Sequence, residues 1–269
     1  MKIRAESVRE YFDGQIQRGR RLLPDPETVS GLGTWLKYAS AAALMAEPRF
    51  RRILDLGCNR GSLEYFYETR SSPRHAVPKA VIGVDPSGLA INQAAALGLA
   101  YCSFAVADGL SLPFSDESFD LVIMVEVIEH VPDKETLMAE VARVLRPGGL
   151  LYLTTPNPHC YALRLEDALW NAARRALGKP QLEKDEYIDA GSLTGLLERA
   201  GLRLLNPDDT YCWPRVFIYF RGWAVFPPLP PGSLMRYQRW WISHLEHTEA
   251  PQSLKERLML SVRILAEKD

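Results

Sequence analysis

The chain has 269 residues, of which 47% are hydrophobic and 24% charged, and its formal net charge at pH 7 is −1. This composition is ordinary for a globular protein, and the length fits one α/β domain with additions better than two full domains. A net charge so close to zero provides none of the strong positive field that attracts nucleic acid. Residues 53–210 hold 14 basic and 22 acidic residues, a balance that suits a cationic ligand.

The sequence shows no signal for export or membrane insertion. Residues 1–14 are charged and lack the apolar stretch of a signal peptide. No apolar run approaches the roughly 18 residues of a membrane-spanning helix. Cys58, Cys102, Cys160 and Cys212 lie far apart without a C-x-x-C pair, which favours neither a zinc site nor a disulfide framework. We therefore expect a reduced, cytoplasmic setting.

The order of apolar runs predicts helices that alternate with strands. Residues 1–50 predict one or two helices, because good helix formers fill Ala39–Ala46 and Pro48 follows them. Ser87 and Asp133 are expected N-caps. The predicted helices after residue 50 are 62–69, 87–97, 133–145 and 192–199. The predicted strands are 52–56, 80–84, 101–107, 119–125, 150–154, 202–205 and 260–265.

This alternation predicts an α/β fold: a Rossmann-like, seven-stranded, mostly parallel sheet with helices on both faces. Right-handed crossovers place the loops that follow parallel strands at one edge of such a sheet, where ligands bind. We expect an N-terminal helical cap over 1–50 and a cofactor-binding core over 51–210. An aromatic insertion or lid is expected over 211–257, and the last core strand over 258–269.

Ile53–Gly61 predicts a strand that ends in a glycine turn, and Val81–Asp85 predicts a second strand that ends in an acid. Glycine lets the backbone approach a ligand where a β-carbon would clash. A carboxylate at the end of the second strand can accept hydrogen bonds from both hydroxyls of a ribose. Gly57 and Gly61 do not complete the G-x-G-x-x-G pattern of dinucleotide folds. Together these features predict a nucleoside pocket.

Four short segments carry a resemblance to a known family. Asp55–Gly61 resembles motif I of the class I S-adenosylmethionine-dependent methyltransferases, usually D-L-G-C-G-x-G, with Asn59 in place of the middle glycine. Asparagine is among the residues that tolerate a positive φ, so we expect the turn to form. The other segments are Val106–Phe114, Ser118–Val122 and Leu145–Gly149, which resemble D-a-x-x-L-P-F, S-F-D-x-V and L-x-P-G-G.

The resemblance covers residues 50–205 and implies S-adenosylmethionine as cofactor, with S-adenosylhomocysteine as product. It implies that Asp55 and Gly57 hold the methionine part, that Asp85 holds the ribose, and that Asp108 with Gly109 holds the adenine. The full set of expected cofactor-binding residues is Asp55, Gly57, Cys58, Gly61, Asp85, Pro86, Asp108, Gly109 and Glu126. Capping a turn is the alternative role of Asp108, and positioning its own loop is the alternative role of Glu126.

Glu126–His130 follows the predicted strand 119–125 and resembles the E-V-x-E-H element of ubiquinone-pathway O-methyltransferases and small-RNA 2′-O-methyltransferases. In those families the two Glu and the His can bind a divalent metal. The RNA enzymes have a second His downstream, and 181–189 contains none, which disfavours an RNA substrate. His130 is the candidate general base, with metal binding and a loop-holding hydrogen bond as its alternatives. We assign no metal.

Two further regions concern the methyl acceptor. Asn157 and His159 follow the fifth predicted strand at the same edge, so they are candidates on the substrate side, with a proline-punctuated loop as the alternative. Residues 211–241 hold ten of the 26 aromatic residues and five prolines. Such a surface suits apolar or ring-bearing molecules and membrane interfaces. A self-packed lid is the alternative.

The sequence therefore predicts a methyltransferase that acts on a small, apolar or aromatic molecule, preferably at oxygen. Its expected partner is this small-molecule acceptor and no nucleic acid, with a peripheral membrane or lipid contact through 211–241 left open. Two alternatives remain. One is a metal-assisted RNA 2′-O-methyltransferase that uses Glu126, Glu129 and His130, and the other is a partner subunit that binds the cofactor without catalysis.

Overall fold

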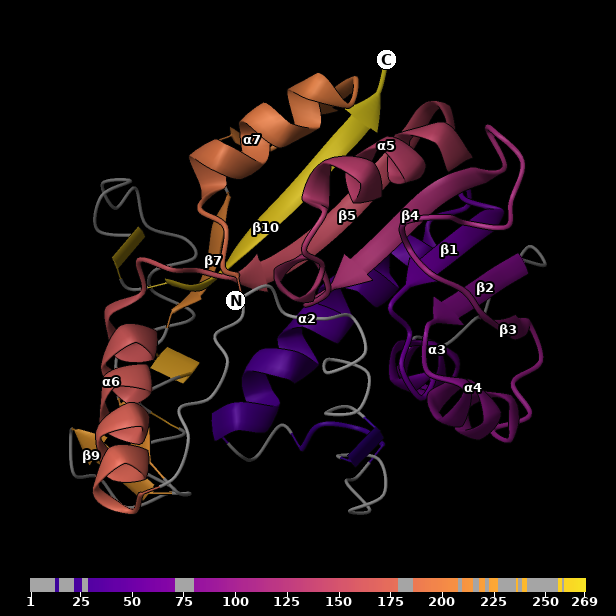
Figure 1. The fold of residues 1–269 in the computed structure, drawn as a ribbon. Coiled ribbons are helices and arrows are strands. Elements are labelled where there is room, and N and C mark those ends of the chain that lie inside the picture. Colours follow the sequence, from indigo (N-terminus) through magenta and orange to yellow (C-terminus); the bar gives the residue numbers. More distant parts are fainter. Residues whose placement is uncertain are drawn as a thin grey trace.

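Strands and helices alternate around one central sheet (Figure 1). The computed structural model describes residues 13–14, 22–25, 29–70, 80–178, 186–207, 210–214, 218–220, 223–226, 236, 239–240, 256–257 and 259–269. In these ranges no helix is long and apolar enough to cross a membrane. Parts of the expected cap 1–50 and of the expected insertion 211–257 lie outside the described residues.

Within the described ranges, seven strands follow one another in the order β3-β2-β1-β4-β5-β10-β6, and β7 also pairs with β10. Neighbours from β3 to β5 are parallel, whereas β10 runs antiparallel to β5 and β6. The mostly parallel, Rossmann-like sheet is thus confirmed. Its strands are β1 (Arg52–Leu56), β2 (Ala80–Asp85), β3 (Cys102–Val106), β4 (Phe119–Val125), β5 (Leu145–Pro156), β6 (Leu202–Leu204), β7 (Tyr211–Pro214) and β10 (Met259–Lys268).

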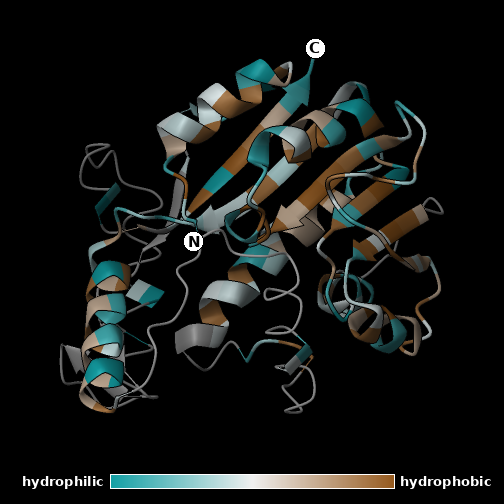
Figure 2. Cartoon of the chain, viewed as in Figure 1, coloured by the Kyte–Doolittle hydropathy of each residue, from teal (hydrophilic) through white to brown (hydrophobic). Residues whose placement is uncertain are grey.

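The central strands form because their apolar runs are buried on both faces, as parallel sheets require. In β4, every residue from Phe119 to Met124 is buried, and Figure 2 shows the middle of the sheet as its most hydrophobic part. Successive side chains alternate between the faces. Leu54 and Leu56 of β1 therefore join one hydrophobic cluster, while Ile53 joins the other.

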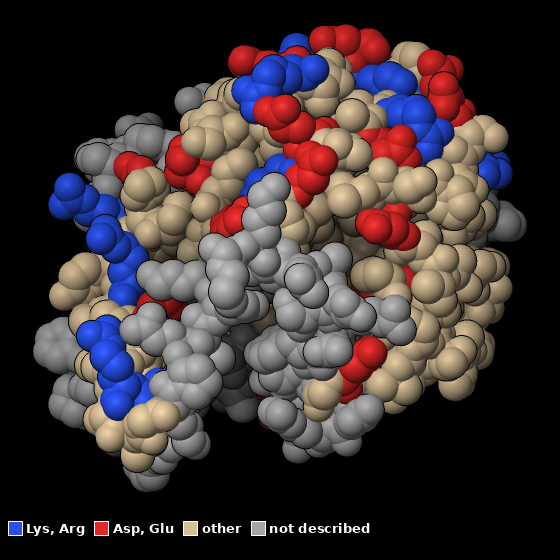
Figure 3. Space-filling view, in the orientation of Figure 1, with Lys and Arg blue, Asp and Glu red and all other residues tan. Residues whose placement is uncertain are grey.

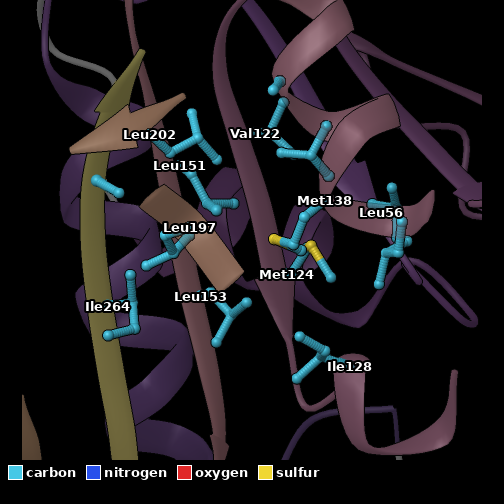
Figure 4. Close-up of a cluster of buried hydrophobic side chains, with 14 of the residues drawn as sticks. Leu56, Val122, Met124, Ile128, Met138, Leu151, Leu153, Leu197, Leu202 and Ile264 are labelled. Carbon is cyan, nitrogen blue, oxygen red and sulfur yellow. The ribbon is translucent and has the colours of Figure 1, made fainter. Parts of the chain in front are cut away.

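Helices cover both faces of the sheet (Figure 1). The face with Ile53 is covered by α2 (Val29–Ala46) and α3 (Ser62–Arg70), and the opposite face by α5 (Lys134–Val144) and α7 (Ala190–Arg199). Between β2 and β3 in the chain lies α4 (Gly88–Ala95), which packs beside both strands. Figure 4 shows part of the larger cluster, with Leu56, Val122, Met124, Ile128, Met138, Leu151, Leu153, Leu197, Leu202 and Ile264 labelled.

Two expected N-caps are confirmed. Ser87 Oγ accepts a hydrogen bond from the amide of Ala90 at 3.0 Å, at the start of α4. Asp133 Oδ1 accepts from the amide of Thr136 at 3.0 Å, at the start of α5. Each cap satisfies an amide that the first helical turn leaves without a backbone partner.

Other boundaries differ from the prediction for local reasons. Leu145 pairs with Phe119 ahead of a register shift, so β5 begins there and contains the proline–glycine turn expected to precede the strand. Asp189 accepts from both the amide and the hydroxyl of Ser192, so α7 begins before Ser192. Helix α6 (Tyr161–Ala176) is not predicted, because its N-cap, Cys160, forms no side-chain capping bond and provides no start signal.

The residues after 210 contribute to two sheets. β7 pairs with the first half of β10, next to the stretch of β10 that pairs with β6. β8 (Ile218–Phe220) and β9 (Trp223–Phe226) form a separate antiparallel pair, and β8 lies against α6. The described part of the expected insertion thus extends the main sheet and adds a hairpin beside α6.

Candidate active site

The turn after β1 contains three residues with left-handed backbone. The φ angle is +82° at Gly57, +49° at Asn59 and +72° at Gly61. The expectation that Asn59 would tolerate the turn is confirmed, since its φ lies in the region that asparagine adopts more readily than most residues. The amides of Gly57 and Cys58 both donate to the carbonyl of Val84, at 2.8 and 3.0 Å. The turn is thereby fixed to the end of β2.

Gly57 also brings this turn against the loop that follows β4. A β-carbon on Gly57 would lie 2.4 Å from Val127 Cγ2, which is far inside van der Waals contact. A β-carbon on Gly61 would lie 3.0 Å from the ring of Phe104. The two loops therefore touch, and residues 126–130 lie beside the turn that resembles motif I.

Asp85, at the end of β2, is held by two backbone amides. Its Oδ2 accepts from Asn59 at 3.0 Å and its Oδ1 from Ser87 at 2.9 Å. Burial raises the pKa of this carboxyl, and the two amide bonds oppose that effect. Each carboxylate oxygen has a further lone pair for a ligand hydroxyl. The adjacent Pro86 is exposed, and the ribose contact itself remains a prediction.

Asp108 is exposed and forms a turn cap, because its Oδ1 accepts from the amide of Leu110 at 2.9 Å. An isolated bridge to Ser111 closes the same turn. Gly109 packs closely under it: a β-carbon there would lie 2.9 Å from Leu137 Cδ1. The alternative role of Asp108 is thus present in the structure, while a contact to adenine remains a prediction.

Two buried carboxyl groups meet behind the turn. Asp55 is 3% exposed and Glu64, in the first turn of α3, is 0% exposed, and the two carboxyl groups lie close enough for each to affect the pKa of the other. Burial raises the pKa of Asp55 to about 7 and raises the pKa of Glu64 well above its usual range. The hydroxyl of Tyr38, on α2, lies near enough that the charges of Asp55 and Glu64, together with burial, raise its pKa. Glu64 and Tyr38 are site residues that the motif analysis did not identify.

At the end of β4, Glu126 forms an ion pair with a buried lysine of α2. Lys37 is 5% exposed, and its Nζ lies 2.8 Å from Glu126 Oε2. The backbone of Glu126 has φ +58°, a strained conformation that is more frequent at functional sites. Its amide donates to the carbonyl of Thr154 at 2.9 Å. Its second oxygen, Oε1, is buried and meets no hydrogen-bond partner within the described ranges.

Glu129 and His130 lie one turn further, in a 3₁₀ turn formed by Ile128–His130. Glu129 is 2% exposed, and its Oε2 accepts from the hydroxyl of Thr155 at 3.1 Å. Burial, followed by the nearby charge of Glu126, raises the pKa of Glu129 to about 8. Nε2 of His130 lies 4.0 Å from Glu129 Oε1, and the histidine side chain is 21% exposed. An imidazole with solvent access thus stands beside a carboxyl group that retains its proton at neutral pH.

Within the described part of the chain, the side chains of Glu126–His130 do not combine with others into a metal-binding site. No group of three or more His, Cys, Asp or Glu side chains is arranged there to hold a metal ion. The charge of Glu126 is balanced by the ammonium group of Lys37. The downstream segment 181–189 contains the acids Glu183, Asp185 and Glu186; the first two lie outside the described residues, and Glu186 pairs with Lys134.

The two expected substrate-side residues after β5 take part in structural contacts. Asn157 is fully buried, and its Nδ2 donates to the carbonyls of Glu256 and Met259 at 2.6 and 2.9 Å. Its Oδ1 accepts from the amide of His159. The side chain of His159 is 45% exposed, with Nε2 3.6 Å from Glu256 Oε1. Asn157 therefore joins the end of β5 to β10.

Comparison with known proteins places this chain in a family. A family model described as a methyltransferase domain matches residues 29–206. Methyltransferase GfsG of Streptomyces halstedii is 29% identical over 215 residues, which are 76% of this chain and 71% of that protein. A ubiquinone biosynthesis O-methyltransferase of Rhizobium etli is 36% identical over 167 residues, 61% of this chain and 64% of that enzyme. The match thus spans just under two thirds of the length of the Rhizobium enzyme.

Solved structures share the fold. A S-adenosylmethionine-dependent methyltransferase from Methanosarcina mazei superimposes with a TM-score of 0.53 over 84% of this chain and 96% of that one, at 21% sequence identity. Identity this low supports the fold and leaves the chemistry to the residues at the site.

Proposed function

Since this chain belongs to the S-adenosylmethionine-dependent methyltransferase family, we propose that it transfers a methyl group to an oxygen atom of a small, apolar or aromatic acceptor. When bound, S-adenosylmethionine supplies a methyl group on a positively charged sulfur, and the leaving thioether is neutral. The chain's own residues then have two tasks, which are to align the acceptor with the methyl group and to remove the acceptor's proton.

The residues around the turn after β1 fit the cofactor. The Gly57–Gly61 turn has a positive φ at both glycines, so the backbone can lie close to a ligand. Asp85 is fixed by two amides with lone pairs to spare for hydroxyl groups. The buried carboxyl groups of Asp55 and Glu64 suit the ammonium group of the methionine part. We assign the cofactor site to Asp55, Gly57, Cys58, Gly61, Asp85, Pro86, Asp108, Gly109 and Glu126.

The contact between Gly57 and Val127 carries the proposal, because it sets the acid–base group of the β4 loop beside the cofactor turn. His130 is our candidate for the general base that accepts the proton of an acceptor hydroxyl. The neighbouring Glu129 is protonated at neutral pH. Its carboxyl group can attract the imidazole ring of His130 by charge only after it ionises. Lys37 keeps the charge of Glu126 balanced and provides a cation close to where an oxyanion would form.

The names of relatives support oxygen as the atom methylated, because the Rhizobium enzyme is named an O-methyltransferase of ubiquinone biosynthesis. The aromatic composition of 211–241 supports an apolar or aromatic acceptor. The net charge of −1 offers no support for a nucleic acid substrate.

The proposal is tested with radiolabelled S-adenosylmethionine and a panel of phenols, hydroquinones, hydroxy acids, amines and thiols, with the product identified by mass spectrometry. We expect an O-methyl ether from at least one hydroxylated ring compound. Product on a nitrogen or sulfur acceptor alone would overturn the assignment to oxygen. His130→Asn is expected to lower kcat at least tenfold and to leave cofactor binding unchanged, since only proton removal is affected.

Two arms of this experiment address the alternatives. A small structured RNA, tested with and without a chelator, addresses the metal-assisted RNA reaction; chelator-sensitive methylation of RNA would favour it. Cofactor binding without product from any acceptor would favour a partner subunit that does not catalyse.

We also propose a peripheral contact with an anionic lipid surface, through 211–241 and α6. The described part of this region exposes Trp240, Arg236 and Arg239. Helix α6 beside it exposes Trp170, and its C-cap Leu177 is exposed too. The helix contains Arg164, Arg174 and Arg175. Figure 3 shows Lys and Arg side chains gathered along the side of the molecule that carries α6. Exposed aromatic residues flanked by cations are typical of proteins that lie on a bilayer.

Flotation with lipid vesicles tests this contact. Binding to phosphatidylglycerol vesicles, with little binding to phosphatidylcholine, is expected, and Arg174→Glu should weaken it several-fold. The control is Arg70→Glu, an exposed arginine at the end of α3. Equal loss in both variants, or no flotation of the parent protein, would remove the lipid contact.

A further inference from the structure

Within the described part of the chain, no cation pairs with the two carboxyl groups behind the turn. Neither oxygen of Glu64 meets a hydrogen-bond partner there, and no described ion pair involves Asp55 or Glu64. Asp55 and Glu64 are 3% and 0% exposed, so water does not solvate them either. Burying charged groups without partners is among the most unfavourable arrangements in a folded protein, and the pair therefore requires an explanation.

The sheet is built to accommodate this pair. Asp55 of β1 and Gly83 of β2 are register partners, so their side-chain positions lie on the same face of the sheet. A β-carbon on Gly83 would lie 2.6 Å from Glu64 Oε1 and 2.9 Å from Cys58 Sγ. The missing side chain of Gly83 thus provides the room that the carboxyl group of Glu64 occupies beside Asp55.

The groups around the pair do not neutralise it. Two carboxylates in contact cannot both be ionised, so the pair retains a shared proton near neutral pH. Burial also raises the pKa of the neighbouring thiols and phenol, which therefore stay neutral. The titratable groups that face the pair are Tyr38 from α2, Cys58 and Arg60 from the turn, Asp85 from β2 and Cys102 from β3. Among these, Arg60 acts on Tyr38.

We propose that Glu64 is a cofactor-positioning residue. With Asp55 it forms a two-carboxyl receptor for the α-ammonium group of S-adenosylmethionine, and the shared proton leaves to solvent as the ammonium binds. Glu64 acts through Asp55, which lies near the end of β1 next to the turn, by holding that carboxyl in place and by sharing its proton while no cofactor is bound. The inference rests on the proposed function only in that the cofactor occupies the Gly57–Gly61 turn, and it is independent of the acceptor.

Proton release on binding tests this directly. Calorimetric titrations at pH 6.5, in buffers with different enthalpies of ionisation, count the protons released per cofactor bound. At this pH the α-amino group of the ligand is already protonated, since its pKa is about 8. The ligands are S-adenosylmethionine, S-adenosylhomocysteine, and 5′-methylthioadenosine, which has the nucleoside but neither the ammonium nor the carboxylate group. The proteins are the parent chain, Glu64→Gln, and Glu68→Gln, a control one turn further along α3.

We expect both ammonium-bearing ligands to release about one proton from the parent chain, as displacement of one shared proton requires. The 5′-methylthioadenosine should release none. Glu64→Gln should reduce the release to about a third or less and flatten the pH dependence of Kd, while Glu68→Gln should behave as the parent does.

The outcomes separate the inference from the proposed function. Tight binding of S-adenosylmethionine without proton release, or with release unchanged in Glu64→Gln, overturns the role of Glu64 and leaves the methyltransferase proposal intact. No binding to the folded parent chain overturns both. If Glu64→Gln does not fold, the comparison of S-adenosylmethionine with 5′-methylthioadenosine on the parent chain decides alone, because equal release by both ligands contradicts the receptor.

Discussion

Behind the turn after β1, Asp55 and Glu64 are buried against each other, while at the end of β4, Glu126 is paired with Lys37. Both places bury carboxyl groups at the same edge of the sheet, and each limits the unfavourable charge differently. The first retains a proton, with the pKa of Asp55 raised to about 7, and the second contains a lysine ammonium 2.8 Å away. On our proposal, the site of Asp55 and Glu64 is reserved for a cation from outside, whereas the charge of Glu126 is already balanced.

The largest expected effect comes from removing the internal cation. Lys37→Met leaves the Glu126 charge partly buried and unpaired, so the free energy of unfolding should fall by about 2–4 kcal/mol. Glu126 is 29% exposed, which limits the loss. Urea unfolding followed by circular dichroism measures it. Lys37→Arg is the control, and it should recover at least half of the lost stability. A loss below 0.5 kcal/mol would mean that this pair behaves as a surface salt bridge.

The second prediction concerns the protonated pair in the cofactor-free protein. Because the pKa of Asp55 rises from 3.8 to about 7 on folding, its contribution to stability is fully present below about pH 4 and is lost as the pH rises through 7. Each retained proton gives a slope of up to about 1.4 kcal/mol per pH unit. Glu64→Gln removes one acid and adds an amide donor, so it should be more stable than the parent at pH 8 by about 1–3 kcal/mol.

Urea unfolding at pH 5, 6.5 and 8 measures this difference. The decline in stability between pH 5 and 8 should be shallower in Glu64→Gln than in the parent and in Glu68→Gln. A decline of the same slope in all three proteins would show that the two carboxyl groups do not share a proton.

A third prediction concerns Asp85, which lies beside the turn after β1. Asp85→Ala should weaken S-adenosylmethionine binding by well over tenfold, because the partly buried carboxyl group that we assign to the two ribose hydroxyls is lost. Asp85→Asn keeps one carbonyl acceptor for the amides of Asn59 or Ser87 and should lie between the two proteins. Calorimetric titration of all three gives the comparison. Unchanged affinity in Asp85→Ala would remove Asp85 from the cofactor pocket.

The smallest expected effect is at Thr154, whose carbonyl accepts from the amide of Glu126. Thr154 is fully buried, and its Oγ1 meets no partner in the described part of the chain. Thr154→Val removes this hydroxyl with little change of shape, so stability should stay equal or rise by up to about 1 kcal/mol. Thermal unfolding checks stability, and acceptor KM checks function. A rise in KM with unchanged cofactor Kd would mean that the hydroxyl binds the acceptor.

The sequence predicted most strands and helices along the chain because apolar runs, glycine turns and N-caps are local signals. Ser87 and Asp133 cap helices as expected, and the Gly57–Gly61 turn adopts the positive φ angles that its residue types allow. Long-range partners were not predictable in the same way. Lys37 lies 89 positions before Glu126 in the chain, and its helix contains no motif that would indicate the pair. Glu64 lies in the first turn of α3, and the sequence alone does not show that this position matters. Its role can be recognised only in the structure, where Gly83 leaves room for its carboxyl group.

Helix α6 and the role of Asn157 show a second limit of the sequence analysis. The helix begins at Cys160 without a capping side chain, so its start is decided by packing rather than by a local signal. Asn157 follows a strand at the ligand edge, yet its amide joins backbone carbonyls more than 95 residues away in the chain. A polar residue at that edge supports tertiary structure as readily as it binds a substrate.

The position of β10 also bears on the order in which the chain folds during synthesis. This strand, Met259–Lys268, lies between β5 and β6, and its pairing with β5 joins residues more than 100 positions apart. Before these residues leave the ribosome, β6 has no neighbour to pair with, and the edge of β5 is exposed. Such long-range pairing is slow and leaves strand edges open to association. The nascent chain should therefore remain dependent on chaperones until β10 has been made.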